Sequence, residues 1–200
     1  MSVVVRLYEL ELEYCQGVYW PSDDSFLLAD ALKGVTKGEL AVDVGSGTGI
    51  VSLVMAKARV RVIATDIDLD SAKCTWSNAK RNNLDHMVDV VCCNLIEPLR
   101  TSAKLNIIAS NPPYLPGDWK KEQDVCGGPR GIEVIEELIL QALPFIRKGA
   151  RLYLVVSSIS DFNSILKKLG ELCLSFNILN KRSFGLFEDI LLMEVFSKDS

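Results

Sequence analysis

The stretch Glu39–Lys57 constrains the fold of this 200-residue chain more than any other. It begins with a short apolar run, Leu40 to Val44, which is typical of a buried strand. Gly45-Ser46-Gly47-Thr48-Gly49 follows directly, and its glycines let the backbone turn tightly and let a ligand approach without meeting a Cβ atom. A helical run begins at Ile50. A strand, a glycine turn and a helix in this order predict an α/β unit with a binding loop between its elements.

Apolar strand-like runs alternate with amphipathic helical runs along most of the chain. The predicted strands cover residues 39–44, 61–66, 89–93, 105–109 and 151–156, and the predicted helices cover residues 22–32, 50–57, 70–81, 130–147 and 161–169. Because parallel neighbours need a crossover helix, this alternation predicts a mostly parallel sheet with helices on both faces. Residues 173–181 and 190–196 form two further predicted strands with no helix between them, so one of this pair is expected to run antiparallel.

The N-terminal segment carries a different pattern. From Leu7 to Glu13, glutamates alternate with apolar residues, and this period of two predicts a half-buried strand at an edge or over the ligand entrance. Ser22, Asp23 and Asp24 then offer N-cap oxygens and first-turn carboxylates to the next helix. No linker, repeat or low-complexity segment follows. A single domain over residues 1–200, with residues 1–20 as a short extension, is expected.

The charge balance argues against a broad nucleic-acid surface. The chain has 22 Lys and Arg against 26 Asp and Glu, and its net charge is −4. Neutralisation of phosphates by basic side chains supplies most non-specific affinity for nucleic acid, and this chain lacks a basic excess. Local pairs such as Lys80-Arg81 and Lys120-Lys121 are expected to be solvated surface.

The cysteines are expected to be reduced thiols in an intracellular protein. They are Cys15, Cys74, Cys92, Cys93, Cys126 and Cys173. Several stand in apolar strand-like or helical runs, Cys92 and Cys93 among them, where a free thiol packs as a small hydrophobic group. No Cys-x-x-Cys pair occurs and His86 is the only histidine, so no zinc site is expected. With no signal-peptide pattern and no apolar run long enough for a membrane span, we expect a cytoplasmic protein.

Polar side chains stand at the ends of three predicted strands. Asp43 precedes the glycine loop, Asp66 ends the second strand and Asn94 follows the third. The carboxyl ends of parallel strands meet at the edge where open α/β sheets bind ligands, so these groups are expected to converge. A carboxylate before the glycine loop disfavours a pyrophosphate and suits an ammonium or sulfonium group. Asp66 suits the hydroxyls of a ribose, and Asn94 suits an adenine edge.

The loop Asn111-Pro112-Pro113-Tyr114 follows the apolar run at 105–109. Two consecutive prolines forbid a helix and remove two backbone donors, so the loop is stiff. Asn111 and a proline carbonyl can accept both hydrogens of an NH2 group, while Tyr114 stacks on its plane. This loop therefore suits a small planar substrate that carries an NH2 group.

Together, these motifs resemble those of class I S-adenosylmethionine-dependent methyltransferases that methylate amino groups. Val18–Leu28 resembles the Tyr-x-Pro-x-x-Asp-[Ser/Thr] opening of the glutamine methyltransferases that modify release factors, and Gly127–Gly131 resembles their Gly-Gly-x-x-Gly segment. The resemblance covers residues 14–196 and is to the short archaeal and eukaryotic branch. The sequence departs from the family pattern at Asn94, where aspartate is commoner, and at Ser25, where threonine is commoner.

The resemblance implies a Rossmann-like fold with a seven-stranded, mostly parallel sheet, S-adenosyl-L-methionine as the cofactor, and N5-methylation of a release-factor glutamine. It implies that Asn111, the Pro112 carbonyl and Tyr114 are the catalytic group and that they bind the substrate amide. The cofactor contacts that it implies are Ser25, Asp43, Gly45, Gly47, Gly49, Asp66, Asn94, Leu95 and Asn111. It also implies a possible partner, a small zinc-binding activator subunit that adds a strand to the sheet.

Three other functions remain open at this point. Related enzymes could use the same loop to methylate a protein lysine. An N6-adenine methyltransferase would apply the same stacking and acceptors to a flipped base in DNA or RNA, although the acidic charge and the missing target-recognition domain argue against it. A cofactor-binding scaffold without activity is the third, and the intact loop from Asn111 to Tyr114 argues against that.

Overall fold

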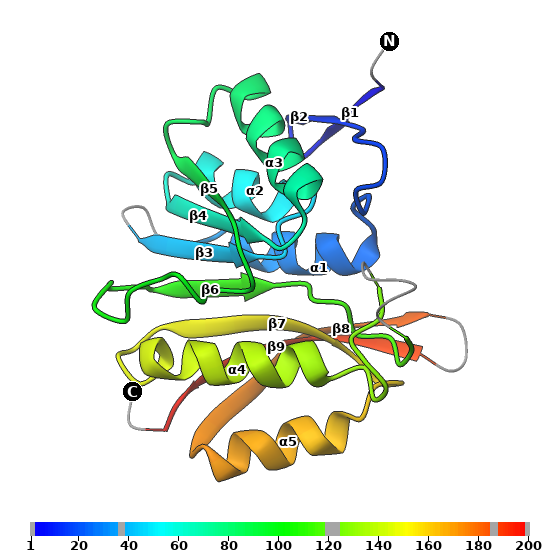
Figure 1. Cartoon of the computed structure of the whole chain (residues 1–200), viewed down its shortest axis with the longest axis vertical. Coiled ribbons are helices and arrows are strands. Elements are labelled where there is room, and N and C mark those ends of the chain that lie inside the picture. Colours follow the sequence, from blue (N-terminus) through cyan, green and yellow to red (C-terminus); the bar gives the residue numbers. More distant parts are fainter. Residues whose placement is uncertain (1–2, 36–38, 119–124, 185–187, 199–200) are drawn as a thin grey trace.

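A computed structural model describes residues 3–35, 39–118, 125–184 and 188–198. The main sheet contains seven strands in these residues: β3 (Leu40–Val44), β4 (Arg61–Asp66), β5 (Val88–Cys92), β6 (Ile107–Ser110), β7 (Arg151–Ser157), β8 (Leu174–Phe184) and β9 (Glu188–Ser197). Their order is β5-β4-β3-β6-β7-β9-β8 (Figure 1). β9 runs antiparallel to β7 and β8, and the other neighbours are parallel. The predicted fold class is therefore confirmed.

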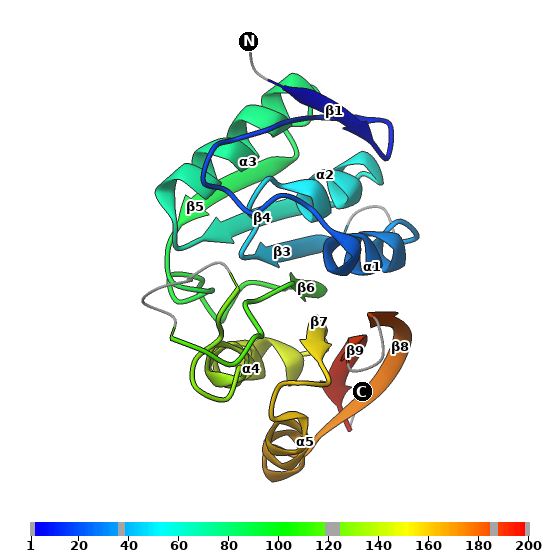
Figure 2. The ribbon, with the colours of Figure 1, turned by 90° about the vertical axis from the view of Figure 1, so that its right-hand side faces the viewer.

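Helices cover both faces of this sheet (Figure 2). They are α1 (Asp23–Leu32), α2 (Ile50–Lys57), α3 (Leu69–Arg81), α4 (Glu133–Ile146) and α5 (Phe162–Glu171). Alternate strand residues serve the two faces, because side chains of a strand point to opposite sides. Ala41 packs in the core beneath α1 and α2, whereas its neighbour Val42 packs in the core beneath α4 and α5. Both faces of β3 are thus buried, as its apolar sequence predicts.

Two predicted details of the helix starts are wrong. Ser22 stands at the N-cap of α1, but its side chain makes no capping hydrogen bond. The carboxylate of Asp24 instead accepts the backbone N–H of Ser25 at 2.6 Å. α4 begins at Glu133 rather than at 130, because the backbone just before it folds against the loop that follows β6.

The N-terminal segment forms its own two-stranded antiparallel sheet, β1 (Val4–Leu7) and β2 (Leu10–Glu13). Tyr8 and Glu9 turn between the strands with φ of 54° and 59°, as in a tight two-residue hairpin. The predicted alternation is confirmed, because Leu10 and Leu12 are buried while Glu11 between them is exposed. The predicted single strand is wrong, because two short strands pair with each other.

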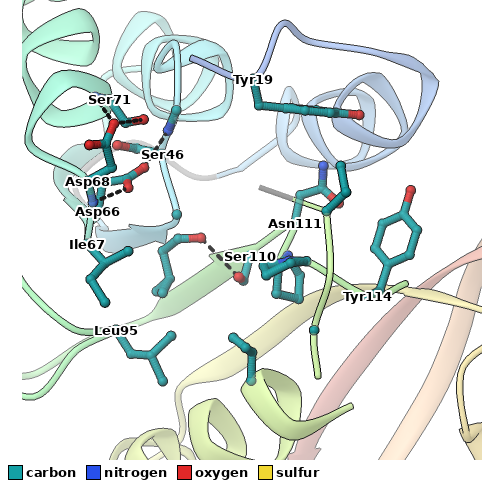
Figure 3. Close-up of a pocket in the computed structure, with 18 of the residues that line it drawn as sticks. Tyr19, Ser46, Asp66, Ile67, Asp68, Ser71, Leu95, Ser110, Asn111 and Tyr114 are labelled. Atoms are coloured by element: carbon teal, nitrogen blue, oxygen red, sulfur yellow. Dashed lines mark hydrogen bonds between the residues drawn. The ribbon is translucent and has the colours of Figure 1, made fainter. Parts of the chain in front are cut away.

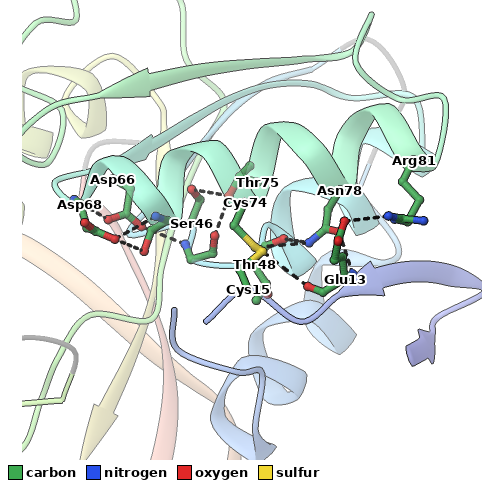
Figure 4. The surroundings of a disulfide bond; sticks show 12 residues. Glu13, Cys15, Ser46, Thr48, Asp66, Asp68, Cys74, Thr75, Asn78 and Arg81 are labelled. Atoms are coloured by element: carbon green, nitrogen blue, oxygen red, sulfur yellow. Dashed lines mark hydrogen bonds and ion pairs between the residues drawn. A yellow bond between two sulfur atoms is a disulfide. The ribbon is translucent and has the colours of Figure 1, made fainter. Parts of the chain in front are cut away.

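This hairpin packs on α3 rather than on the main sheet. Asn78 Oδ1 accepts the backbone N–H of Glu13, and Asn82 Oδ1 accepts that of Glu11, both at 2.8 Å. Arg81 adds an ion pair with the Glu13 carboxylate at 2.7 Å (Figure 4). Side-chain amides of α3 therefore satisfy backbone donors that an isolated hairpin would expose.

The prediction that every cysteine is reduced is wrong for Cys15 and Cys74. These residues form a disulfide between the end of the hairpin and α3, with Cα atoms 6.1 Å apart (Figure 4). The packing of the hairpin on α3 brings them together across 59 positions, which sequence spacing does not reveal. Cys92 is exposed rather than buried, because β5 is an edge strand, whereas Cys126 is buried.

Loss of the disulfide should lower the free energy of unfolding by about 2–4 kcal/mol, because it closes a long loop in the unfolded chain. Guanidinium unfolding of the Cys15→Ser variant and of the wild type, both without reductant, measures this difference. Cys173→Ser removes an exposed free thiol and serves as the control, with an expected midpoint equal to that of the wild type. Equal midpoints for Cys15→Ser and wild type would contradict a stabilising disulfide.

Candidate active site

A cavity of about 590 Å³ opens at the carboxyl ends of β3, β4 and β6 (Figure 3). The strand register creates it. Val44 pairs with Thr65 on one side and with Ser110 on the other, so the next residues, Gly45, Asp66 and Asn111, lie at the same level, where β3 and β6 have ended. The predicted site residues that line the cavity are Ser25, Asp43, Gly45, Gly47, Asp66, Asn94, Leu95, Asn111, Pro112 and Tyr114.

The glycine loop is closed by hydrogen bonds to β4. Gly45 and Ser46 donate their backbone N–H groups to the Thr65 carbonyl at 2.8 and 3.0 Å. Gly47 donates its N–H to the Asp66 carboxylate at 2.9 Å. Gly45 has a φ of 72°, and a Cβ atom there would meet nothing within 4 Å. Glycine is therefore favoured by the backbone at this position, and the space beside it is open to a ligand.

Gly49, a predicted cofactor contact, is not among the described residues that line the cavity. A Cβ atom there would lie 3.0 Å from the Thr75 methyl carbon, so Gly49 allows α3 to approach the loop closely. The Thr75 hydroxyl donates to the Gly47 carbonyl at 2.9 Å and lies 2.9 Å from the Ser46 hydroxyl (Figure 4). α3 thus supports the loop from behind.

Two carboxylates at the ends of β3 and β4 line the cavity. Asp43 is 2% exposed, and its Oδ2 accepts the backbone N–H and the hydroxyl of Ser52 at 2.9 and 2.5 Å. Burial raises the pKa of Asp43 to about 6. Asp66 accepts the backbone N–H of Asp68 at 3.0 Å as well as that of Gly47. Asp43 therefore holds the first turn of α2, and Asp66 holds the loops around it, in addition to lining the cavity.

Asn94 can replace the aspartate that is commoner at its position. Its Nδ2 donates to Oε1 of Glu137 on α4 at 3.2 Å, and Gln141 donates to the same atom at 3.1 Å. Because the NH2 group is directed at a carboxylate, the Asn94 carbonyl oxygen is the atom that faces elsewhere as an acceptor. An amide held in this way offers a ligand an acceptor, as a carboxylate would.

The Asn111 amide is also held in one orientation. Its Nδ2 donates to the Ser25 hydroxyl at 3.3 Å, while its Oδ1 is buried and has no hydrogen-bond partner. Among the described residues, one other buried side-chain polar atom lacks a partner, Thr65 Oγ1, and Thr65 lines the same cavity. Buried polar atoms are nearly always paired in proteins. Two unpaired atoms on one cavity indicate a site for a polar ligand.

Asp24 connects this amide to two tyrosines. Its side chain is buried, and its Oδ2 accepts the hydroxyls of Tyr19 and Tyr114 at 3.0 and 2.9 Å. The Tyr19 ring lies above Asn111 and the Tyr114 ring lies beside it (Figure 3). Burial is the main cause that raises the pKa of both phenols well above the usual value, and the charge and hydrogen bond of Asp24 raise it further. Both tyrosines are therefore protonated donors.

The glycine segment before α4 supports the active loop from the other side. A Cβ atom at Gly127 would lie 2.3 Å from the Pro113 carbonyl oxygen, and one at Gly131 would lie 2.3 Å from that of Tyr114. Gly127 also donates its backbone N–H to the Leu115 carbonyl at 3.0 Å. The backbones are so close that a larger residue would displace the loop.

The sequence prediction assigned none of Tyr19, Asp24 and Glu137 to this site, although Tyr19 and Asp24 are the tyrosine and the aspartate of the Tyr-x-Pro-x-x-Asp-[Ser/Thr] opening. For Asp24 a signal was present: it stands four positions before the buried Leu28, which places it on the inner face of α1. Glu137 carries no such local signal, because it lies on the polar side of a helix.

Other predicted features lie away from the cavity. His86, Lys80 and Arg81 are exposed, as expected for surface residues, and the Lys120-Lys121 pair falls outside the described residues. In the part of the chain that the structure describes, no three His, Cys, Asp or Glu side chains group in a way that could hold a metal ion. No described helix combines the length and apolarity needed to cross a bilayer.

Comparison with known proteins identifies the family. The family described as Methyltransferase small domain matches residues 22–181. The chain belongs to this family. A Methanocaldococcus jannaschii relative named as a protein N5-glutamine methyltransferase is 28% identical over 177 residues, which are 85% of this chain and 87% of the relative. The mouse methyltransferase HEMK2 is 30% identical over 169 residues, which are 77% of this chain and 78% of that protein.

These relatives place this methyltransferase in the HemK group, and the predicted family is confirmed. A solved structure supports the fold. The E. cuniculi Mtq2–Trm112 complex, described as responsible for methylation of the translation termination factor eRF1, matches with a TM-score of 0.64 and 24% identity. The match covers 90% of this chain and 99% of that chain. The class I methyltransferase architecture is thus shared.

The raised pKa of Asp43 predicts how stability depends on pH. The usual value is 3.8 and the folded value is about 6, so between them the folded state binds more protons than the unfolded state and stability falls as pH rises. Asp43→Asn removes this titration. From pH 4 to pH 6, the free energy of unfolding of wild type should fall by about 2 kcal/mol relative to that of the variant. Urea unfolding at several pH values measures it, and a constant difference would contradict the assignment.

Replacement of Gly131 by alanine should impair methyl transfer, because the new Cβ atom would press on the Tyr114 carbonyl and Gly131 has a φ of 72°. We expect a stability loss of about 1–3 kcal/mol and a lower kcat, with cofactor affinity nearly unchanged. Gly170→Ala is the matched control, because Gly170 lies in α5 and a Cβ atom added there would meet nothing within 4 Å. The control should be neutral or slightly stabilising. A fully active Gly131→Ala enzyme would show that this contact does not position the loop.

Proposed function

We propose that this methyltransferase transfers a methyl group from S-adenosyl-L-methionine to the side-chain amide nitrogen of a glutamine in a class I release factor. The observation that carries the proposal is the buried, unpaired Oδ1 of Asn111. A carboxamide NH2 group supplies one hydrogen for this oxygen and a second for the Pro112 carbonyl. The activity for which the M. jannaschii relative is named supports glutamine as the substrate residue.

The polar groups of the cavity fit S-adenosylmethionine. That molecule carries an ammonium, a sulfonium, ribose hydroxyls and an adenine amino group, which suit anionic and acceptor partners. Asp43 and Gly45 would hold the amino-acid end, Asp66 the ribose, and Asn94 with Leu95 the adenine. When bound, the cofactor supplies an electrophilic methyl group.

The chain's acceptors act on the glutamine nitrogen. An amide nitrogen shares its lone pair with the carbonyl and is a poor nucleophile. Asn111 Oδ1 and the Pro112 carbonyl accept its two hydrogens, and these hydrogen bonds strengthen as positive charge develops on nitrogen, so they stabilise the transition state more than the ground state. Tyr114 packs on the amide plane. The methylated cation is acidic enough to lose its proton to water, so no general base is needed.

Ser25 takes a further role beside the cofactor contact that the family resemblance implies. Its hydroxyl bonds to the Asn111 amide rather than serving the cofactor alone. We assign to it the orientation of that amide, with Oδ1 directed away from Ser25 and available to the substrate.

A partner protein is part of the proposal. The related Mtq2 was solved as a complex with Trm112, which supports an activator subunit for this chain too. That this subunit is small and binds zinc is what the family resemblance implies. The edge strand β5 offers unpaired backbone groups, and the exposed Ile67 and Leu69 lie just beyond the end of the adjacent β4. These features suit a partner that adds a strand and covers apolar surface.

The proposal also includes the domain organisation and the location. One domain would carry the activity, and it would act in the cytoplasm, where release factors act.

The Asn111→Ala variant should lose methyl transfer by about 100-fold or more, because it removes an acceptor aimed at developing charge. Cofactor affinity, measured by calorimetry, should change little. The matched control is Asn180→Ala, an exposed position on β8. Transfer of labelled methyl is measured on a release factor, total protein, DNA and tRNA in parallel.

Label on a release-factor glutamine, lost in Asn111→Ala, is the expected result. Label on DNA or tRNA alone would overturn the proposed substrate. The proposed activity would be overturned if no label reached any of the four substrates although the cofactor binds, and if a candidate activator did not change this result.

A further inference from the structure

We propose that Asp24 is a positioning residue that orients two groups assigned to the substrate amide. It orients the Tyr114 ring directly and the Asn111 amide through Ser25. The inference rests on the proposed function for its effect on turnover. It adds a residue whose buried charge controls which atom of Asn111 faces the substrate.

The Ser25 hydroxyl has a single proton to donate. Oδ1 of Asp24 lies 3.2 Å from this hydroxyl and accepts its proton, because a carboxylate can only accept. The hydroxyl then has only lone pairs left, and it must accept from Asn111 at 3.3 Å. The Asn111 NH2 group is thereby directed toward Ser25, and its Oδ1 is directed away as the unpaired acceptor.

The same carboxylate determines the direction of two phenols. Tyr19 and Tyr114 both donate to Oδ2 of Asp24, so both hydroxyl protons are directed at this carboxylate. The tether also limits rotation of the Tyr114 ring about its side-chain bonds. One anion, only 5% exposed, therefore fixes an aromatic face and an amide that come from a loop 90 positions away.

A purely structural role explains this arrangement less well. Burial of a carboxylate costs free energy unless donors satisfy it, and the side-chain donors to Asp24 all belong to residues that line the cavity, Tyr19, Ser25 and Tyr114. The neighbouring Asp23 shows the contrast: it is exposed and pairs with Arg182 at 2.7 Å. Asp23→Asn is therefore a matched control, in the same helix turn but outside the cavity.

The first test reads the orientation without activity. In the ¹⁵N–¹H spectrum of the full chain, the Asn111 side-chain NH2 signals are assigned by their absence in Asn111→Ala. Asp24→Asn replaces the obligate acceptor with a group that can donate to Ser25, which releases the hydroxyl proton toward Asn111. We expect the Asn111 signals to shift in Asp24→Asn and in Ser25→Ala, and to stay in place in Asp23→Asn. Unchanged signals in Asp24→Asn would overturn the inference.

The second test reads turnover. Asp24→Asn should lower kcat on the order of 100-fold, with the cofactor dissociation constant within about threefold of wild type. In a Ser25→Ala background the further loss should be clearly smaller, because the route to Asn111 is already broken. Full kcat in Asp24→Asn would overturn the inference. So would a double variant whose loss of kcat equals the product of the losses in Asp24→Asn and Ser25→Ala. If wild type methylated no glutamine, the proposed function would fail, and the spectrum would still decide the role of Asp24.

Discussion

The site depends on the parallel pairing of β3 with both β4 and β6. This register places the residues after Val44, Thr65 and Ser110 at one level, so that a glycine turn, a carboxylate and an amide lie side by side at the edge of the sheet. None of the three could meet the others if the strands slipped by one residue, because each side chain would change face. The cores on the two faces of β3 hold that register. Packing of apolar side chains therefore determines the chemistry of the cavity.

Within that frame, the direction of hydrogen bonds decides what the cavity can bind. The NH2 groups of both amides at the site are directed to protein partners, Asn94 to Glu137 and Asn111 to Ser25. Their carbonyl oxygens are then the groups left for ligands. The acids Asp43 and Asp66 add acceptors and negative charge. A site made in this way favours partners rich in N–H, O–H and positive charge, which describes both S-adenosylmethionine and a carboxamide nitrogen during methylation.

Much of the fold and of the site could be predicted from the sequence, because short continuous segments determine these features. The strand and helix runs, the glycine turn and the Asn-Pro-Pro-Tyr loop each carry a local signal, and parallel topology brings strand ends together. The contacts that join distant segments could not be predicted. The disulfide between Cys15 and Cys74, the pairing of the N-terminal strands and the bond between Ser25 and Asn111 all depend on tertiary packing. Asp24 lies between these cases, since helical spacing places it inward but only the fold reveals its tyrosines.

The most direct test is a crystal structure of the enzyme with S-adenosylhomocysteine and a release-factor peptide that contains the acceptor glutamine. The account predicts that the glutamine amide nitrogen lies roughly 2.7–3.2 Å from both Asn111 Oδ1 and the Pro112 carbonyl oxygen, with the Tyr114 ring on the amide plane. It would be contradicted if the nitrogen bound elsewhere, or if Asn111 presented its NH2 group to the substrate.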